Sequence, residues 1–158
     1  ALIKSEAVLN GFAEAIVLNQ DGHVAEGSAE NFFLVRGDTL ITPPVYANVL
    51  EGITRRTVIE LVQREIGLKV VEREIDRSEI YVADEAFFCG TGVQVVAIAS
   101  VDHRDIGSGR IGPVTRQLRD LYFRVVRGEE AKYTHWLTPV YTTPAAGQPA
   151  PQPVAAAV

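Results

Sequence analysis

A chain of 158 residues is long enough to fold as one compact domain with a hydrophobic core, and 47% hydrophobic with 22% charged residues is typical of a globular protein. The net charge of −5 argues against nucleic acid or an anionic membrane as a partner, and no apolar run approaches the roughly 18 residues of a membrane span. The single Cys89 excludes an internal disulfide, which is compatible with a reducing cytoplasm.

The N-terminal residues have helical spacing over residues 1–10, and Gly11 is a plausible end of that helix. The chain contains no methionine, and its first residue, Ala1, lies inside the helical pattern. We therefore expect a piece of a longer polypeptide. The alternative is a complete small protein with a trimmed N-terminus.

The next segment predicts an antiparallel meander. Asp21-Gly22 is a strong hairpin signal between two apolar runs, and Gly37-Asp38 marks a second turn. The predicted strands are residues 14–19, a return strand that begins at Val24, residues 31–37 and residues 39–43.

Two amphipathic helices follow, interleaved with further strands. The first covers residues 52–67, with Thr54 as a predicted N-cap and Gly67 as the end. The second covers residues 112–128, and its apolar stripe consists of Val114, Leu118, Leu121 and Val125. Strands are predicted at residues 68–74, 85–92 and 93–102, with a helical turn at 76–84.

Together these elements predict an α+β domain, with an antiparallel-rich, barrel-like sheet and flanking helices, rather than an alternating doubly wound fold. We assign residues 1–141 to this domain. Residues 142–158 are rich in Pro and Ala and carry no charge, so we predict a disordered tail.

Two glutamates stand close together in a loop of small residues, Glu26-Gly27-Ser28-Ala29-Glu30-Asn31. A carboxylate there can approach a ligand closely, because neither Gly nor Ala blocks it. Paired with a ring nitrogen, it could stabilise that nitrogen as a cation. Taken alone, the same residues also fit the polar start of a strand with solvated acids.

The start of the first amphipathic helix, at Leu50–Arg55, could bind an anion. Free N–H groups at a helix N-terminus, with the Thr54 hydroxyl among them, would suit a phosphate, although an ordinary N-cap explains the pattern as well.

Cys89-Gly90-Thr91-Gly92 lies between two apolar strands. Two glycines around a threonine leave backbone donors and a hydroxyl uncovered, but a tight bend explains them equally well. Cys89 itself is expected to be a small buried hydrophobe. The histidines, His23, His103 and His135, show no metal-ligand spacing, so no metal site is predicted.

In order and spacing these motifs resemble the fold type IV pyridoxal-phosphate aminotransferases, and within them the branched-chain amino acid aminotransferases. The resemblance covers residues 1–128 and is carried by "EAIVLNQDGHVAEGSAENFFLV", "LITPP", "LEGITRRTVIEL", "VVEREIDRSEIYVADEAFFCGTGVQVVAIASVDHRDIG" and "GRIGPVTRQL". It implies the large C-terminal domain of that fold, with pyridoxal 5'-phosphate as the cofactor.

The resemblance also implies roles for individual residues. Glu26 would pair with the pyridine nitrogen of the cofactor, and Leu50 would pack against the ring face. Ile53, Thr54 and Thr91 would bind the cofactor phosphate. Thr91 and Gly92 would contact the substrate, and Glu30 and Asn31 would support these cofactor- and substrate-binding residues.

The Schiff-base lysine of the family does not match any lysine in this chain, which has only Lys4, Lys69 and Lys132. By the resemblance it is expected upstream of Ala1, together with a small N-terminal domain, either in the same polypeptide or as a separate chain. This chain alone is then expected to be inactive.

The implied reaction moves the amino group of leucine, isoleucine or valine to 2-oxoglutarate in a cytoplasmic homodimer or higher homo-oligomer. D-amino acid aminotransferases, (R)-amine transaminases and aminodeoxychorismate lyases share the motifs and stay open as alternatives. A non-catalytic cofactor-binding remnant or interaction module is an alternative of another class.

Overall fold

A five-stranded sheet forms the centre of the protein, in a computed structural model that describes residues 2–140. Its strand order is β5-β4-β3-β6-β7, and only β4 and β5 run parallel. The central strand is buried from Asn31 to Val35, because both faces of the sheet are covered. The strands are β3 (Asn31–Arg36), β4 (Thr39–Thr42), β5 (Lys69–Glu72), β6 (Glu85–Gly90) and β7 (Gln94–Ala97).

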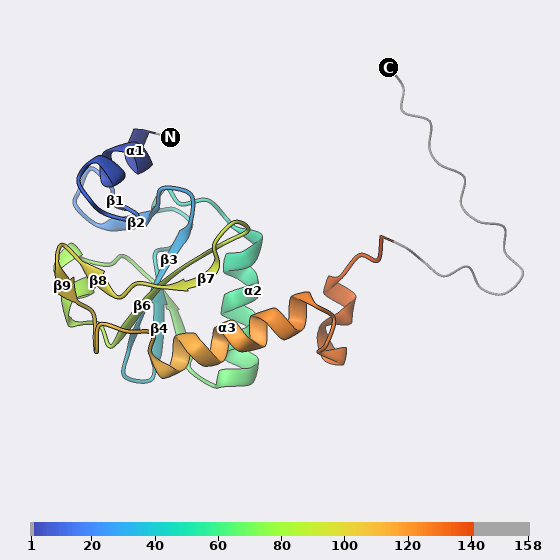
Figure 1. Ribbon diagram of the computed structural model, residues 1–158. Helices are drawn as coiled ribbons and strands as arrows, with labels where there is room; N and C mark the ends of the chain where they lie inside the picture. Colours follow the sequence, from blue (N-terminus) through green and yellow to red (C-terminus); the bar gives the residue numbers. More distant parts are fainter. Residues whose placement is uncertain (1, 141–158) are drawn as a thin grey trace, which may run out of the picture.

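Two helices cover one face of this sheet (Figure 1). They are α2 (Ile53–Leu61), which continues as a π-helical turn (Val62–Ile66), and α3 (Pro113–Val126). Phe33 and Phe87 stack on this face with ring centroids 5.0 Å apart, and Leu118 of α3 packs into the same core. A 3-10 helix (Ala131–Trp136) follows α3 and adds Tyr133 to that core.

The opposite face carries a second core, because side chains alternate along β3. Phe32 and Leu34 point to this side, where Val24 and Ile80 join them. The covering elements are the hairpin of β1 (Ile16–Leu18) and β2 (Val24–Gly27), a 3-10 helix (Arg77–Val82), and the hairpin of β8 (Ser100–Val101) and β9 (Arg104–Asp105). The helix α1 (Leu2–Leu9) lies beside β1 (Figure 1).

The α+β class and the predicted elements are largely confirmed. The Asp21-Gly22 hairpin, with Gly22 at φ 88°, and both amphipathic helices lie where the sequence predicts them. The domain boundary after residue 141 stays a prediction, and the predicted tail lies outside the described residues.

The prediction of an antiparallel meander is wrong at the connection between β2 and β3. The β1–β2 hairpin is a separate two-stranded sheet, and β3 pairs with β4 and β6 instead of β2. The loop after Gly27 redirects the chain, and β6 supplies an apolar strand long enough to match β3 over five residue pairs. The single strand predicted at residues 93–102 is likewise divided, into β7 and β8.

Glu85 caps the long helix α3, a role that the sequence does not reveal. Its two carboxylate oxygens accept hydrogen bonds from the Val114 N–H at 2.9 Å and the Thr115 N–H at 2.8 Å, and the residue is 7% exposed.

The Glu85→Ala variant should therefore lose about 1–3 kcal/mol of unfolding free energy in urea titrations, because two helix N–H groups lose their acceptor in a buried place. The exposed Glu129 offers a matched control, and Glu129→Ala should leave stability unchanged. Equal stability of the two variants would contradict the capping role.

Among residues 2–140 no helix has both the length and the apolar character needed to cross a membrane.

Candidate active site

Glu26, on β2, is fixed by a small hydrogen-bond network at the end of the central sheet where β3 begins. Its Oε2 accepts hydrogen bonds from the Leu50 N–H at 2.9 Å and from Asn31 Nδ2 at 3.2 Å. Asn31 Nδ2 also donates to the Leu50 carbonyl oxygen at 2.8 Å. The structure therefore brings Glu26, Asn31 and Leu50 together, and no hydrogen bond within the described part of the chain uses Glu26 Oε1.

The N-terminus of α2 follows directly after this network and carries no side-chain cap. The N-cap is Gly52, so the predicted Thr54 cap is wrong, and Thr54 lies inside the first turn at 8% exposure. A side chain at position 52 would overlap the buried Asn31, since an ideal Cβ there would lie 2.3 Å from Asn31 Oδ1. The first N–H groups of α2 have no intrahelical acceptor and are available to an anion.

Arg55 is a buried residue that the sequence analysis missed. It is 3% exposed, and its Nη2 donates to the Pro43 carbonyl oxygen at 2.9 Å and to Glu72 at 2.6 Å. The signal was present, because position 55 falls on the same helical face as Val58 and Val62. Its charge is paired with the Glu72 carboxylate, and its Nε has no hydrogen-bond partner among the described residues.

Glu30 closes the tight turn between β2 and β3. Its carbonyl oxygen accepts the Gly27 N–H at 2.6 Å, and its Oε2 accepts the Ala29 N–H at 3.0 Å. A Cβ on Gly27 would lie 2.7 Å from that carboxylate, so the turn needs glycine there. At 9% exposure, Glu30 folds inward over the turn and bonds its own loop.

Thr91 and Gly92 are exposed in the turn between β6 and β7. The turn lies beside the Glu26 loop, because Asn31 pairs with Cys89 and an ideal Cβ on Gly90 would lie 3.4 Å from the Ala29 carbonyl oxygen. Thr91 thus lies at the same end of the sheet, but no hydrogen bond joins it to Glu26 or Thr54 among the described residues.

Leu50 and Ile53 expose large apolar side chains at this site, 72% and 75% respectively. The two cavities described for this structure are lined by other residues. Glu26, Thr54 and Thr91, which the resemblance assigns to one cofactor, thus lie at one end of the central sheet, and neither cavity is lined by any of them.

Cys89 is completely buried, and burial raises the pKa of its thiol to about 12. It behaves as a small hydrophobe, as predicted. Within residues 2–140 no group of three His, Cys, Asp or Glu side chains is arranged to hold a metal ion.

Two of the three lysines form ion pairs, and the third lies on an edge strand away from Glu26. Lys4 Nζ donates to Glu14 at 2.7 Å, and Lys132 Nζ donates to Glu65 at 2.5 Å. Lys69 begins the edge strand β5 opposite Thr39. None of them contacts Glu26.

Glu14 connects α1 to the Glu26 loop. Burial alone would raise its pKa, but hydrogen bonds from Lys4, Ser28 and the Ala15 N–H lower the pKa from 4.5 to about 2. A lowered pKa in the folded state stabilises the fold above pH 4.5, and this contribution is lost as the pH falls toward 2.

Glu14→Gln should therefore reduce the unfolding free energy at pH 7, and its difference from the parent chain should shrink between pH 4.5 and about 2 in urea titrations. The exposed Glu6→Gln is the control. A difference that stays constant across that range would contradict the assignment.

The family model for amino-transferase class IV matches residues 1–101. The chain belongs to the class IV aminotransferases. A relative from Aquifex aeolicus, named as a probable branched-chain-amino-acid aminotransferase, is 50% identical over 141 residues, which cover 89% of this chain and 45% of the relative.

Solved structures show the same relationship. The branched-chain amino acid aminotransferase of Thermobaculum terrenum in its PLP-form has a TM-score of 0.86 at 50% identity, over 89% of this chain and 46% of that one. The branched-chain aminotransferase of the archaeon Thermoproteus uzoniensis, solved with norvaline, has a TM-score of 0.84 at 46% identity, over 89% and 46%. The chain thus has the fold type IV architecture and spans slightly less than half the length of these class IV relatives.

Proposed function

We propose that this chain is the cofactor-binding half of a branched-chain amino acid aminotransferase that uses pyridoxal 5'-phosphate to move the amino group of leucine, isoleucine or valine to 2-oxoglutarate. The observation that carries the proposal is the Glu26 network, which fixes a carboxylate beside an uncapped helix N-terminus. The names of the relatives support the reaction class.

The residues at the site fit the chemistry of this cofactor. The first turn of α2 offers unbonded N–H groups and the Thr54 hydroxyl to a phosphate. Glu26 offers Oε1 to a protonated ring nitrogen while Oε2 is held by Leu50 and Asn31.

In this proposal, Glu26 keeps the proton on the ring nitrogen. When bound, the cofactor supplies the electron sink that stabilises negative charge at the α-carbon of the substrate. A fixed carboxylate is effective here because it is already oriented before the reaction, so little reorganisation is needed as charge develops. Asn31 donates hydrogen bonds to both Glu26 and the Leu50 carbonyl oxygen, and thus fixes the position of the Glu26 carboxylate relative to α2.

The remaining residues would bind the cofactor and orient the substrate. Ile53 and Thr54 hold the phosphate through backbone N–H groups and a hydroxyl, and Thr91 adds a second hydroxyl from the β6–β7 turn. The side chain of Leu50, which is exposed in this chain, would pack against the ring face. The Gly92 backbone would contact the substrate carboxylate, and nothing lies within 4 Å of an ideal Cβ at this position.

The rest of the active site comes from polypeptide outside this chain. The relatives extend over more than twice the matched length, and none of the three lysines here contacts Glu26. We propose that the Schiff-base lysine lies in that remaining part, and that the complete enzyme is a cytoplasmic homodimer or higher homo-oligomer. The buried Cys89, the only cysteine, is consistent with that compartment.

The test uses the protein that contains this chain together with the part that the relatives have outside the match. Amino transfer to 2-oxoglutarate should be faster from leucine, isoleucine and valine than from D-alanine or a simple amine. Preference for D-alanine or for the amine would reassign the chain within the superfamily. No transfer from any donor, and no cofactor absorbance band after dialysis, would favour a non-catalytic remnant.

A further inference from the structure

Arg55 joins the two ends of the loop between β4 and α2. Its Nη2 donates hydrogen bonds to the carbonyl oxygen of Pro43, where the loop begins, at 2.9 Å, and to Glu72 Oε2 on β5 at 2.6 Å. Arg55 itself lies in the first turn of α2, directly after the loop ends. One guanidinium nitrogen therefore connects the start of the loop, the helix that follows the loop and the edge strand of the sheet.

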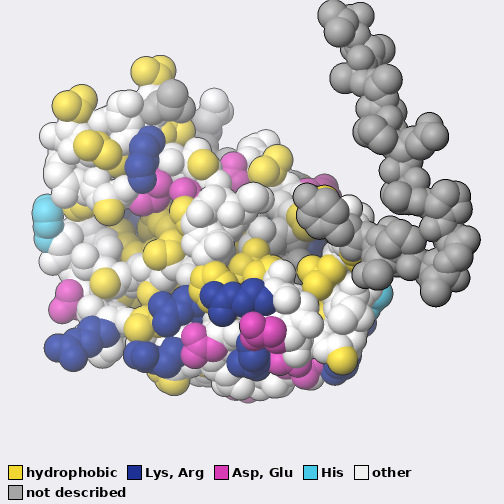
Figure 2. Space-filling view, turned by 45° about the vertical axis from the view of Figure 1, so that its right-hand side comes forward, with side chains coloured by type: hydrophobic (Ala, Val, Ile, Leu, Met, Phe, Trp, Pro, Cys, Tyr) yellow, Lys and Arg dark blue, Asp and Glu magenta, His cyan; other side chains and the backbone are white. Residues whose placement is uncertain are grey.

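The position of this charge is unfavourable by itself. A cation in the first turn of a helix opposes the helix dipole, and a buried arginine loses its hydration. Arg55 is 3% exposed and its Nε has no partner among the described residues, whereas Figure 2 shows basic and acidic side chains side by side at the surface, where water solvates them. Because a buried ion pair adds little net stability, the fixing of one arrangement explains Arg55 better.

The loop has few other contacts that could fix it. Its side chains Val45, Tyr46 and Leu50 are exposed and do not pack into either core. The Ala47 carbonyl oxygen accepts a hydrogen bond from Asn19 Nδ2 at 2.9 Å, which ties the middle of the loop to the turn between β1 and β2. This contact does not join the end of β4 to α2, and Arg55 does.

The loop and the helical turn after it carry the cofactor contacts of the proposed function. The Leu50 N–H donates to Glu26 Oε2 at 2.9 Å. Ile53 and Thr54, the proposed phosphate contacts, lie in the same turn of α2 as Arg55. A shift of α2 relative to β4 would therefore change the distance between the phosphate donors and the Glu26 carboxylate.

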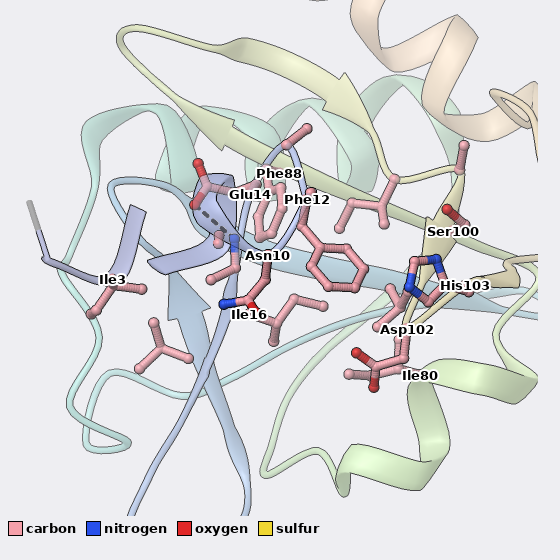
Figure 3. Close-up of a pocket in the computed structure, with 18 of the residues that line it drawn as sticks. Ile3, Asn10, Phe12, Glu14, Ile16, Ile80, Phe88, Ser100, Asp102 and His103 are labelled. Atoms are coloured by element: carbon pink, nitrogen blue, oxygen red, sulfur yellow. Dashed lines mark hydrogen bonds between the residues drawn. The ribbon is translucent and has the colours of Figure 1, made fainter. Parts of the chain in front are cut away.

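Neither cavity described for this structure gives Arg55 a ligand of its own. The larger, of about 850 Å³, lies on the side of the second core, where Figure 3 shows Phe12, Ile80 and Phe88 around it, and Arg55 does not line it. Arg55 lines the smaller, of about 520 Å³, but its Nη2 is already bonded to Glu72 there. Acidic and basic side chains balance in that lining, which does not favour a further anion: Glu51, Glu60 and Glu72 with Arg55, Arg56 and Arg64.

We propose that Arg55 is a positioning residue that holds the start of α2 against the end of β4. The N–H groups of Ile53 and Thr54 then keep a fixed distance from the Glu26 carboxylate. The phosphate and the ring nitrogen belong to one small molecule, so a site that already has the matching distance binds it with a smaller loss of conformational freedom. Arg55 acts through these residues and does not touch the cofactor. This inference rests on the proposed function.

The test compares pyridoxal 5'-phosphate with pyridoxal, which lacks the phosphate, in the complete protein that contains this chain. Arg55→Met keeps an unbranched side chain but removes its hydrogen bonds. The ratio of the Kd for pyridoxal to the Kd for pyridoxal 5'-phosphate should fall by roughly tenfold or more, as expected when a charge-assisted hydrogen bond is lost. Arg56→Met removes the same charge at the adjacent, exposed position and should leave the ratio unchanged.

The two possible failures are distinguishable. If the parent protein binds pyridoxal 5'-phosphate and the ratio is unchanged in Arg55→Met, Arg55 is a structural ion pair only and the inference is overturned, whatever the melting temperature of the variant. If the parent protein binds neither compound, the proposed function fails, and the inference fails with it.

A second measurement needs no cofactor. Amide hydrogen exchange at Leu50 in the cofactor-free complete protein should be roughly tenfold faster in Arg55→Met than in the parent, because the Leu50 N–H stays bonded to Glu26 only while the loop is held. If Arg55→Met does not fold, Glu72→Gln replaces it, and the exposed Glu74→Gln is its control. Glu72→Gln should speed exchange at Leu50 and lower the ratio, whereas Glu74→Gln should change neither. Equal results for these two variants contradict the positioning role.

Discussion

Replacing Glu26 with glutamine should lower the rate of amino transfer by the complete enzyme by on the order of 10²–10³-fold, the cost of removing one preorganised charge-stabilising group. Glutamine retains an oxygen that can accept the Leu50 N–H, so the loop between β4 and α2 should keep its position. What is lost is the negative charge that holds the ring-nitrogen proton. The measurement is kcat with leucine and 2-oxoglutarate, accompanied by the melting temperature.

Glu51→Gln is the control for this substitution. It removes the same charge one residue beyond Leu50, but Glu51 is exposed and makes no hydrogen bond in the described part of the chain. We expect kcat within about twofold of the parent, since an exposed charge is largely screened. If Glu26→Gln and Glu51→Gln have the same kcat, Glu26 does not act on the ring nitrogen.

Replacing Gly52 with alanine should disrupt the site without changing any charge. The added Cβ would lie 2.3 Å from Asn31 Oδ1, so the Asn31 amide must move away from the Leu50 carbonyl oxygen and from Glu26. Overpacking of this kind costs about 1–3 kcal/mol of unfolding free energy. In the complete enzyme we also expect weaker binding of pyridoxal 5'-phosphate, measured as loss of cofactor absorbance on dialysis.

Gly92→Ala provides the matched control for stability. Nothing lies within 4 Å of an ideal Cβ at Gly92, so the change should stay within about 0.5 kcal/mol. A second arm combines Gly52→Ala with Asn31→Ser, whose shorter side chain relieves the overlap. The double variant should lose clearly less stability than the sum of the two single variants. Additive losses would show that the Gly52–Asn31 contact is not the cause.

The strands and helices of the fold could largely be predicted, whereas the pairing of the strands could not. A continuous apolar run predicted β3, and amphipathic spacing predicted α2 and α3, because these patterns depend on neighbours within one element. The meander failed between β2 and β3, because β6, more than fifty residues further along the chain, pairs with β3 instead. No local pattern reports such a partner, nor the parallel pairing of β4 with β5.

The candidate site shows the same division. Glu26, Leu50 and Asn31 were named from the motif order, and the structure joins them by hydrogen bonds. Gly52 and Arg55 were not assigned a role, although each lies within two residues of a named position. The reason is that Gly52 is needed only because Asn31 fills the space above it, and the burial of Arg55 depends on Pro43 and Glu72.

By itself the sequence determined the secondary-structure elements, the α+β class and, through the order of its motifs, the family. Each of these can be predicted from residues that are close in the chain or from the spacing of motifs along it, without knowledge of tertiary contacts. Only the tertiary structure decided the strand order, the start of α2 at Gly52 without a side-chain cap, and the burial of Arg55. These follow from side chains and backbone groups that meet across long stretches of chain, where packing and hydrogen-bond satisfaction select one arrangement among several that local preferences allow.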